Sequence, residues 1–202
     1  MNPTDILVAE HRLIEQVLSC LEALLAQAAA VGRLEQSTAL ETLDFCRAFA
    51  DGYHHAKEEA HLFPLMEANG FSGGCSPIAV MQREHELGRL YVQGMAGTAA
   101  AAANGDPDAL KWFVQHGQSY IKLLREHIRK EDLCLFPAAN HRLTDKDQQK
   151  LRAAFAAVEA EEIRKGTPAK YQALANALAE RFHVPRVDVE IGSHPGGCGC
   201  AK

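Results

Sequence analysis

Apolar residues recur at intervals of three and four along most of the chain, which is the period of an amphipathic helix. The clearest case runs from Leu7 to Leu25. Thr4 or Asp5 can cap this helix and Gly32 follows its end, so the pattern predicts a first helix over residues 4–30. The same spacing predicts further helices over residues 37–68, 76–103, 107–140, 144–165 and 171–182.

Four long helices joined by short loops predict an all-α fold, an antiparallel up-down four-helix bundle with an extra C-terminal helix and an irregular Cys-containing tail. We expect the bundle to span residues 1–165, with its core at 4–140, and a C-terminal extension to span residues 166–202. Pro64 and Pro137 should each kink or end a helix, because proline lacks the amide hydrogen. A short β-like run after residue 184 leads into the tail, which we expect to be mobile or to lie along the bundle surface.

The composition excludes two classes of partner. The chain has 202 residues, 47% of them hydrophobic, a formal net charge of −5 and a pI near 6.0. Nucleic acids and anionic membranes attract clustered excess Lys and Arg, so we expect neither as a partner. The N-terminal residues alternate charged and apolar types, unlike a secretory signal, and no run approaches 18 uninterrupted apolar residues. We therefore expect a cytoplasmic protein.

Five of the six cysteines fall into two groups. Cys20, Cys46 and Cys134 lie within predicted helices without regular spacing, which favours reduced core thiols over a disulfide framework. Cys198 and Cys200 lie close together in the tail. Such a pair can hold a soft metal, form a reversible disulfide, or pass electrons or metal to a protein partner. The alternative is an unliganded tail.

One motif occurs twice. Residues 54–64 read HHAKEEAHLFP and residues 127–137 read HIRKEDLCLFP. The repeat extends upstream, since EHRL at residues 10–13 is matched by EHEL at residues 84–87. Each half of the chain therefore has a single histidine on one helix and His-x-x-x-Glu on the next. We expect two helical hairpins, related by an approximate twofold axis, with their histidines at similar depth.

Residues four apart share one face of a helix, so His54 can act with Glu58, and His127 with Glu131. His55 and Glu59 have the same spacing, and the neighbouring positions decide between the two pairs. Apolar Ala50, Cys46 and Leu43 precede His54 on its face, whereas polar Asp51, Arg47 and Asp44 precede His55. We therefore expect His54 to face the core and His55 to face water. The candidate metal ligands are His11, His54, Glu58, His85, His127 and Glu131.

These six side chains favour a pair of metal ions. Burying them without metal would cost about 1–3 kcal/mol for each unsatisfied group, unless an extensive polar network formed. A structural zinc typically takes four ligands, often cysteine, so six side chains are too many for one such ion. Two ions bridged by Glu58 and Glu131 fit better, with open positions left over. Imidazole-rich sites with open positions suit iron.

The repeated motif resembles that of hemerythrin-like HHE cation-binding domain proteins. Their hallmarks are a single histidine on helices one and three, and HxxxE(E/D)xxLFP on helices two and four; the resemblance covers residues 4–140. It implies that the six residues are ligands of two iron ions, bridged by carboxylates and an oxo or hydroxo oxygen. The five-histidine pattern of oxygen carriers is not met, because Met81 and Arg89 stand where a second histidine near His85 would lie.

The resemblance implies a non-haem di-iron protein that binds or reduces a small oxidant, namely dioxygen, nitric oxide or peroxide, in a redox-sensing, oxygen-sensing or protective role. One alternative is a di-iron catalase or peroxidase. Another is an iron donor or iron-sulfur cluster repair protein that uses Cys198 and Cys200 to reach a partner. A helical scaffold with adventitious zinc is the last alternative.

Several other residues have two interpretations. Tyr53, Tyr91 and Tyr120 could donate a hydrogen bond or an electron to the centre, or could simply fill the core. Glu59 and Asp132 are expected to face outward, with Asp132 as a substitute ligand. Outward salt bridges are expected for the acids that precede histidines, Glu10, Glu84 and Glu126, and surface positions for His61 and His141. Arg83, Gly88 and Arg89 could shape an entrance for an anion or peroxide.

Overall fold

The structure, a computed structural model, describes residues 2–72, 76–189 and 191. Within these residues the chain is helical and contains no strand, so the predicted all-α class is confirmed. The elements are α1 (Pro3–Val31), α2 (Gln36–Phe45), η1 (Cys46–His55), η2 (Glu58–Leu62), α3 (Phe63–Met66), η3 (Glu67–Phe71), α4 (Pro77–Ala103), α5 (Pro107–Lys130), η4 (Glu131–Leu135), α6 (Phe136–Arg142), α7 (Asp145–Lys165) and α8 (Thr167–Phe182).

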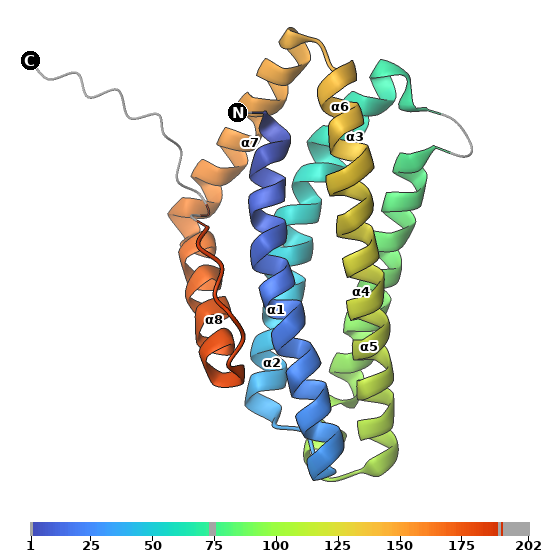
Figure 1. Cartoon of the computed structure of the whole chain (residues 1–202), viewed down its shortest axis with the longest axis vertical. Helices are drawn as coiled ribbons and strands as arrows, with labels where there is room; N and C mark the ends of the chain where they lie inside the picture. Colours follow the sequence, from blue (N-terminus) through green and yellow to red (C-terminus); the bar gives the residue numbers. More distant parts are fainter. Residues whose placement is uncertain (1, 73–75, 190, 192–202) are drawn as a thin grey trace, which may run out of the picture.

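These segments form a four-helix bundle with two further helices at its side (Figure 1). The first long helix is α1; the second joins α2, η1, η2, α3 and η3; the third is α4; the fourth joins α5, η4 and α6. Successive long helices run in opposite directions, and α7 and α8 lie along the side formed by α1 and α2 (Figure 1). The predicted up-down bundle is therefore confirmed.

Local sequence fixes where the helices begin and end. Ser76 and Asp106 accept hydrogen bonds from backbone amides at the starts of α4 and α5, and a proline follows each of them. Thr144 and Asp147 form a reciprocal capping box at the start of α7. Gly32 ends α1 at φ 73°, a left-handed conformation that favours glycine.

Four segments are π-helical, with hydrogen bonds that span one residue more than in an α-helix. Two of them precede the prolines. The amide of Phe63 bonds to the carbonyl of Glu58, and the amide of Phe136 bonds to that of Glu131. The chain remains helical through Pro64 and Pro137, so neither proline ends its helix; instead the helix changes from π-helical to α-helical directly before each proline. A wider turn relieves the clash that proline makes with the preceding turn.

The apolar interior forms two clusters. The larger one includes Leu13 and Tyr53, and the smaller one includes Leu7 and Phe63. On α1, His11 lies between Leu7 and Leu13, and on the second long helix His54 and Glu58 lie between Tyr53 and Phe63. The candidate ligands therefore form a polar layer between two apolar regions, where water has little access.

The C-terminal part of the described chain packs on the bundle. Four residues of α8 belong to the larger cluster: Tyr171, Ala175, Leu178 and Ala179. The segment after α8 forms no strand as far as the structure describes it, so the β-like expectation is wrong there. It lies against the bundle instead, and the Val187 amide donates to Oε1 of Gln16 at 2.6 Å. The division at residue 165 remains a prediction.

Helix α1 is long and apolar enough to cross a membrane, a property that buried core helices share. Half of the window that gives this result is buried inside the bundle. Cys20 and Cys46 are free and buried, as expected, whereas Cys134 is exposed rather than in the core. The tail residues His194, Cys198 and Cys200 lie outside the described residues.

Candidate metal centre

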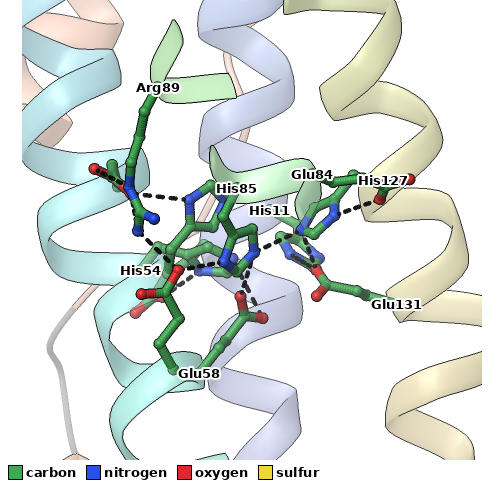
Figure 2. Close-up of polar contacts among 12 residues, drawn as sticks. His11, His54, Glu58, Glu84, His85, Arg89, His127 and Glu131 are labelled. Carbon is green, nitrogen blue, oxygen red and sulfur yellow. Dashed lines mark hydrogen bonds and ion pairs between the residues drawn. The ribbon is translucent and has the colours of Figure 1, made fainter. Parts of the chain in front are cut away.

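The four long helices bring all six predicted ligands to one place (Figure 2). α1 contributes His11, the second long helix His54 and Glu58, α4 His85, and the fourth long helix His127 and Glu131. Each residue is at most 1% exposed. The repeat thus places two equivalent sets of side chains on facing helices.

The donor atoms form two overlapping groups that could each hold a metal ion. His11, His54, Glu58 and Glu131 make up one group, and His55, Glu58, His85 and His127 the other. Within a group all ligand atoms lie within 4.8 Å of one another. Ligand bonds of about 2.0–2.2 Å place two donors on one ion at most about 4.4 Å apart, so small side-chain shifts suffice.

Both carboxylates span the two groups. Glu58 directs Oε1 toward Nε2 of His54 at 3.7 Å and Oε2 toward Nε2 of His85 at 3.4 Å. Oε2 of Glu131 lies 3.3 Å from Nε2 of His11 and 3.2 Å from Nε2 of His127. A carboxylate between two histidine groups can bridge two ions.

Many of these donor atoms have no hydrogen-bond partner among the described residues. They are Nε2 of His11, His54 and His55, and both carboxylate oxygens of Glu58 and Glu131. Nε2 of His85 and Nε2 of His127 face each other at 3.1 Å. An unsatisfied buried polar atom costs about 1–3 kcal/mol. Cations among these atoms would satisfy them, so the residues fit a metal centre.

In His54 and His127, the ring nitrogen that points away from the donor groups, Nδ1, donates a hydrogen bond to a carboxylate. His54 donates to Glu10 at 2.8 Å and His127 donates to Glu84 at 3.0 Å. These two contacts are equivalent in the repeat, because each glutamate precedes a single histidine and binds the histidine of the next helix. A proton held on Nδ1 leaves the Nε2 lone pair free for a metal.

The single histidines are held in the same way. His11 donates from Nδ1 to Asp132 at 2.7 Å, and His85 donates to Glu59 at 2.7 Å. Asp132 follows Glu131 and Glu59 follows Glu58, each in the hairpin opposite to the histidine that it contacts. The second acid of each repeated motif therefore orients the single histidine of the other half.

A cation contacts each of these four carboxylates. Lys57 contacts Glu10, Lys130 contacts Glu84, Arg12 contacts Asp132, and Arg89 contacts Glu59. Lys57 is completely buried, and its ammonium also lies 3.9 Å from the centroid of the Tyr53 ring. The lysine in each copy of the motif thus neutralises the acid that positions the histidine three residues earlier.

The expected outward position is wrong for Glu10 and only partly right for Glu84, Glu59 and Asp132. Glu10 is buried, and Glu84, Glu59 and Asp132 are partly covered by their contacts with the histidines. Asp132 uses its oxygen at Nδ1 of His11, outside both donor groups, so its role as substitute ligand gains no support. Glu126 is exposed and pairs with Arg129, as expected. The repeat signals their common role, because Glu10 and Glu59 in the first half occupy the same positions as Glu84 and Asp132 in the second.

The prediction that His55 faces water is also wrong, since this residue is only 5% exposed. In a regular α-helix, neighbouring residues point about 100° apart, so a narrow inward face that holds His54 turns His55 toward its edge. The π-helical segment η1 ends at His55, and its wider turns change which residues face the core. His55 therefore joins the second donor group.

Burial and neighbouring charges set the protonation of the metal-free cluster. Burial lowers the pKa of His11, but its hydrogen bond to Asp132 and the nearby carboxylate of Glu131 outweigh burial and raise the pKa to about 9. The His127 pKa rises to about 10, because Glu131 and Glu84 outweigh burial. Burial would raise the pKa of Glu131, but His127 and His11 hold it well below its usual value. Protons on two imidazoles therefore take the place of cations.

Other members of the cluster are neutral or close to it. Burial raises the pKa of Glu58 to about 7, and the charge of Glu131 adds to the effect. Burial lowers the pKa of His54 and of His55 well below the ordinary value. Both imidazoles are therefore neutral near pH 7, which is the state that binds metals.

A pocket of about 250 Å³ reaches the second donor group. Its walls include His55 and His85, together with Gly88, Arg89, Tyr120 and Cys46. The guanidinium of Arg89 lies at this pocket and bonds to Asp51 and Glu59. Gly88 and Arg89 line this pocket and Arg83 does not, and the role of the pocket as an entrance remains a prediction.

The tyrosines differ in position. Tyr53 is buried beside Lys57, and Tyr120 is buried in the pocket wall. Tyr91 lies away from the cluster, where its ring is 6.2 Å from that of His116. His61 is half-buried near Phe155, 6.3 Å between ring centroids, and His141 is exposed.

Comparison with known proteins identifies a family. Residues 2–139 match the family described as "Hemerythrin HHE cation binding domain". An uncharacterized protein of Mycobacterium bovis and one of Mycobacterium tuberculosis are each 25% identical to the chain over 178 residues, which cover 88% of this chain and 68% of theirs. No solved structure matches the chain significantly. The family match includes all six predicted ligands.

Proposed function

This chain belongs to the hemerythrin HHE cation-binding family, and on that premise we propose that its buried cluster binds two iron ions that bind or reduce a small oxidant. Dioxygen, nitric oxide and peroxide are the candidates, and the role is redox or oxygen sensing, or protection. The observation that carries the proposal is the convergence of buried, unpartnered imidazole nitrogens and carboxylate oxygens between two apolar clusters.

Two ions are favoured over one by the arrangement of the carboxylates. Glu58 directs one oxygen toward each donor group, and one oxygen of Glu131 lies between His11 and His127. A single ion would leave one group of imidazoles without a partner. With two ions, each imidazole nitrogen and carboxylate oxygen that lacks a hydrogen-bond partner could bind a metal ion.

Iron is favoured over zinc by the donor types. Both groups consist of imidazole and carboxylate, and neither contains cysteine. Structural zinc sites are closed four-coordinate sites that commonly use cysteine. Mixed imidazole and carboxylate ligation with positions left open is typical of redox-active non-haem iron. When bound, the iron pair would supply two electrons or accept them.

The protein's own groups hold the imidazoles rigid. Each of the four predicted histidine ligands donates Nδ1–H to an acid, and each acid is neutralised by Lys or Arg. This arrangement fixes the ring orientation and keeps Nε2 available. The pocket beside His85 admits a small molecule from solvent, while the apolar clusters exclude bulk water.

The proposal is tested by loading anaerobically purified protein with ferrous iron, and by elemental analysis and absorption spectroscopy before and after exposure to oxygen or nitric oxide. We expect two iron ions per chain and a spectrum that changes with the oxidant. Glu58→Ala should lose iron, whereas Glu126→Ala, with its exposed side chain, should not. Fewer than two ions per chain, or zinc held in preference to iron, would contradict the proposal.

A catalase or peroxidase is the second candidate, and the pocket that leads from solvent to His55 and His85 favours a turnover reaction. Catalytic release of oxygen from added peroxide, lost in Glu58→Ala, would support this candidate. A stable complex that releases no oxygen would leave binding or sensing as the function.

A further inference from the structure

His55 shares two features with the four predicted histidine ligands. Its Nδ1 lies 3.4 Å from Oδ1 of Asp51, and Asp51 is in turn bound by Arg89. Its Nε2 is buried and has no hydrogen-bond partner within the described part of the chain. A neutral imidazole carries one N–H and one lone pair, so donation from Nδ1 to Asp51 leaves the Nε2 lone pair directed inward.

The position of His55 joins it to one half of the centre. Its ring stacks on that of His85, with 3.8 Å between centroids and 13° between planes, and lies 5.5 Å from the ring of His127. Its ligand atom belongs to the group formed with Glu58, His85 and His127. The other group, around His11 and His54, contains only two imidazoles.

We propose that His55 is a fifth imidazole ligand, bound to the metal ion that His85 and His127 hold. This inference rests on the proposed two-metal function. It makes the two ions unequal, because one has three imidazoles and the other has two. The second motif reads His-Ile where the first reads His-His, so the asymmetry arises at a position where the two copies of the motif differ.

The alternative role for His55 is packing against His85. Packing alone would be served by an apolar ring, and it would leave Nε2 unsatisfied at a cost of about 1–3 kcal/mol. The contact between Nδ1 and Asp51 is the longest of the five Nδ1–carboxylate contacts. His55 is therefore the least constrained of the five rings and the most easily displaced.

His55 also lines the 250 Å³ pocket and belongs to the second donor group, so it would contact both the pocket and an ion held by that group. A small ligand that enters there must compete with this imidazole. Removal of the ring joins the pocket to the metal position, where free imidazole can bind in its place.

The test compares wild-type protein with His55→Phe, His55→Ala and the control His61→Ala, which alters a histidine of the same long helix outside both donor groups. Phenylalanine keeps the stacking on His85 but has no donor atom. Each protein is loaded anaerobically with ferrous iron; iron affinity is measured by titration, and imidazoles are counted by X-ray absorption.

We expect wild type and His61→Ala to bind two ions with about five imidazoles, while both His55 variants keep the first ion and bind the second at least about tenfold more weakly. Free imidazole should restore the second ion in His55→Ala but not in His55→Phe. Wild-type affinity and an unchanged spectrum in His55→Phe would overturn the role of His55 and leave the two-metal function standing. Fewer than two ions in wild type would overturn both.

Discussion

Glu10 accepts a hydrogen bond from Nδ1 of His54 at 2.8 Å, although the two residues lie on different long helices. The equivalent contact in the second half joins Glu84 and His127 at 3.0 Å. Each glutamate lies on one helix of a hairpin and its histidine on the other. The contact therefore joins the two helices and also fixes the orientation of the imidazole ring. The acids are therefore part of the metal centre although they bind no metal themselves.

Replacing Glu10 by Gln should weaken metal binding, and it should also destabilise the fold because the buried Lys57 loses the carboxylate that it contacts. Gln keeps the size of the side chain but removes the charge that orients Nδ1–H of His54. We expect an iron affinity lower by about 10- to 100-fold, the usual effect of losing such a partner. Competition titration with a chelator measures this change. Glu126→Gln is the control, since Glu126 also precedes a histidine but is exposed; equal affinity in the two variants would contradict the role of Glu10.

Replacing the buried Lys57 by Met should destabilise the metal-free protein strongly. Lys57 is completely buried against Glu10, so its loss leaves that carboxylate without its cation. Breaking a buried ion pair costs about 3–5 kcal/mol in the free energy of unfolding. The repeat supplies a matched control in Lys130→Met, because Lys130 is 36% exposed and its pair with Glu84 should contribute about 1 kcal/mol or less. Urea unfolding of both variants measures the difference, and equal losses would argue against the role of burial.

The fold could be predicted because the helical periodicity is strong and the turns contain glycine and proline. The placement of His11, His54, His85 and His127 in one layer also followed from the repeat, since equivalent helices bury equivalent faces. What could not be predicted was π-helical geometry at η1. Reading residues 46–55 as an α-helix placed His55 on the wrong face, and no simple sequence rule signals the wider turn.

The repeat makes the acids that position the histidines predictable, but a charged residue next to a buried residue in the sequence is usually exposed to solvent. Helical periodicity therefore predicts surface positions for Glu59 and Asp132. Their contacts with His85 and His11 join opposite hairpins, so they depend on tertiary packing that helical periodicity cannot show. The repeat indicates that these acids have a common structural role, because residues that only face solvent have no physical reason to recur at equivalent positions.

Metal binding should release protons and strengthen as pH rises. The pKa of His11 is raised to about 9 and that of His127 to about 10, mainly because nearby carboxylates outweigh burial. Both imidazoles are therefore protonated at pH 7 without metal, and each must lose its proton to bind an ion. Titration calorimetry in buffers of different ionisation enthalpy should detect the release of protons near pH 7.5, about two of them per chain from His11 and His127. Binding that releases no protons would show that the two rings are neutral in the metal-free protein.

The N-terminus of α2 should give stability that disappears in acid. Glu35 accepts hydrogen bonds from the backbone amides of Ser37 and Thr38, and the bond from the Thr38 side chain does most to lower its pKa to about 2. Because the pKa of Glu35 is lower in the folded state than in the unfolded state, its ionised carboxylate stabilises the fold at pH values above 4.5. This stabilisation is lost as pH falls toward 2. Glu35→Ala should therefore lower the free energy of unfolding by about 1 kcal/mol at pH 7, and by much less at pH 2. A difference independent of pH would exclude the charged cap as its cause.

Narrowing the pocket should slow the arrival of small ligands. A Cβ atom at Gly88 would meet the Tyr120 ring at 3.6 Å, an ordinary contact, so Gly88→Val fits the fold and adds methyl groups to the pocket wall. Gly97→Val is the matched control, because it lies on α4 too and a Cβ there meets nothing within 4 Å. In stopped-flow measurements on iron-loaded, oxidised protein, we expect azide to bind roughly tenfold more slowly to Gly88→Val than to Gly97→Val, a barrier higher by about 1.4 kcal/mol. Since neither variant changes a ligand, iron content should stay the same, and equal rates would mean that ligands enter by another path.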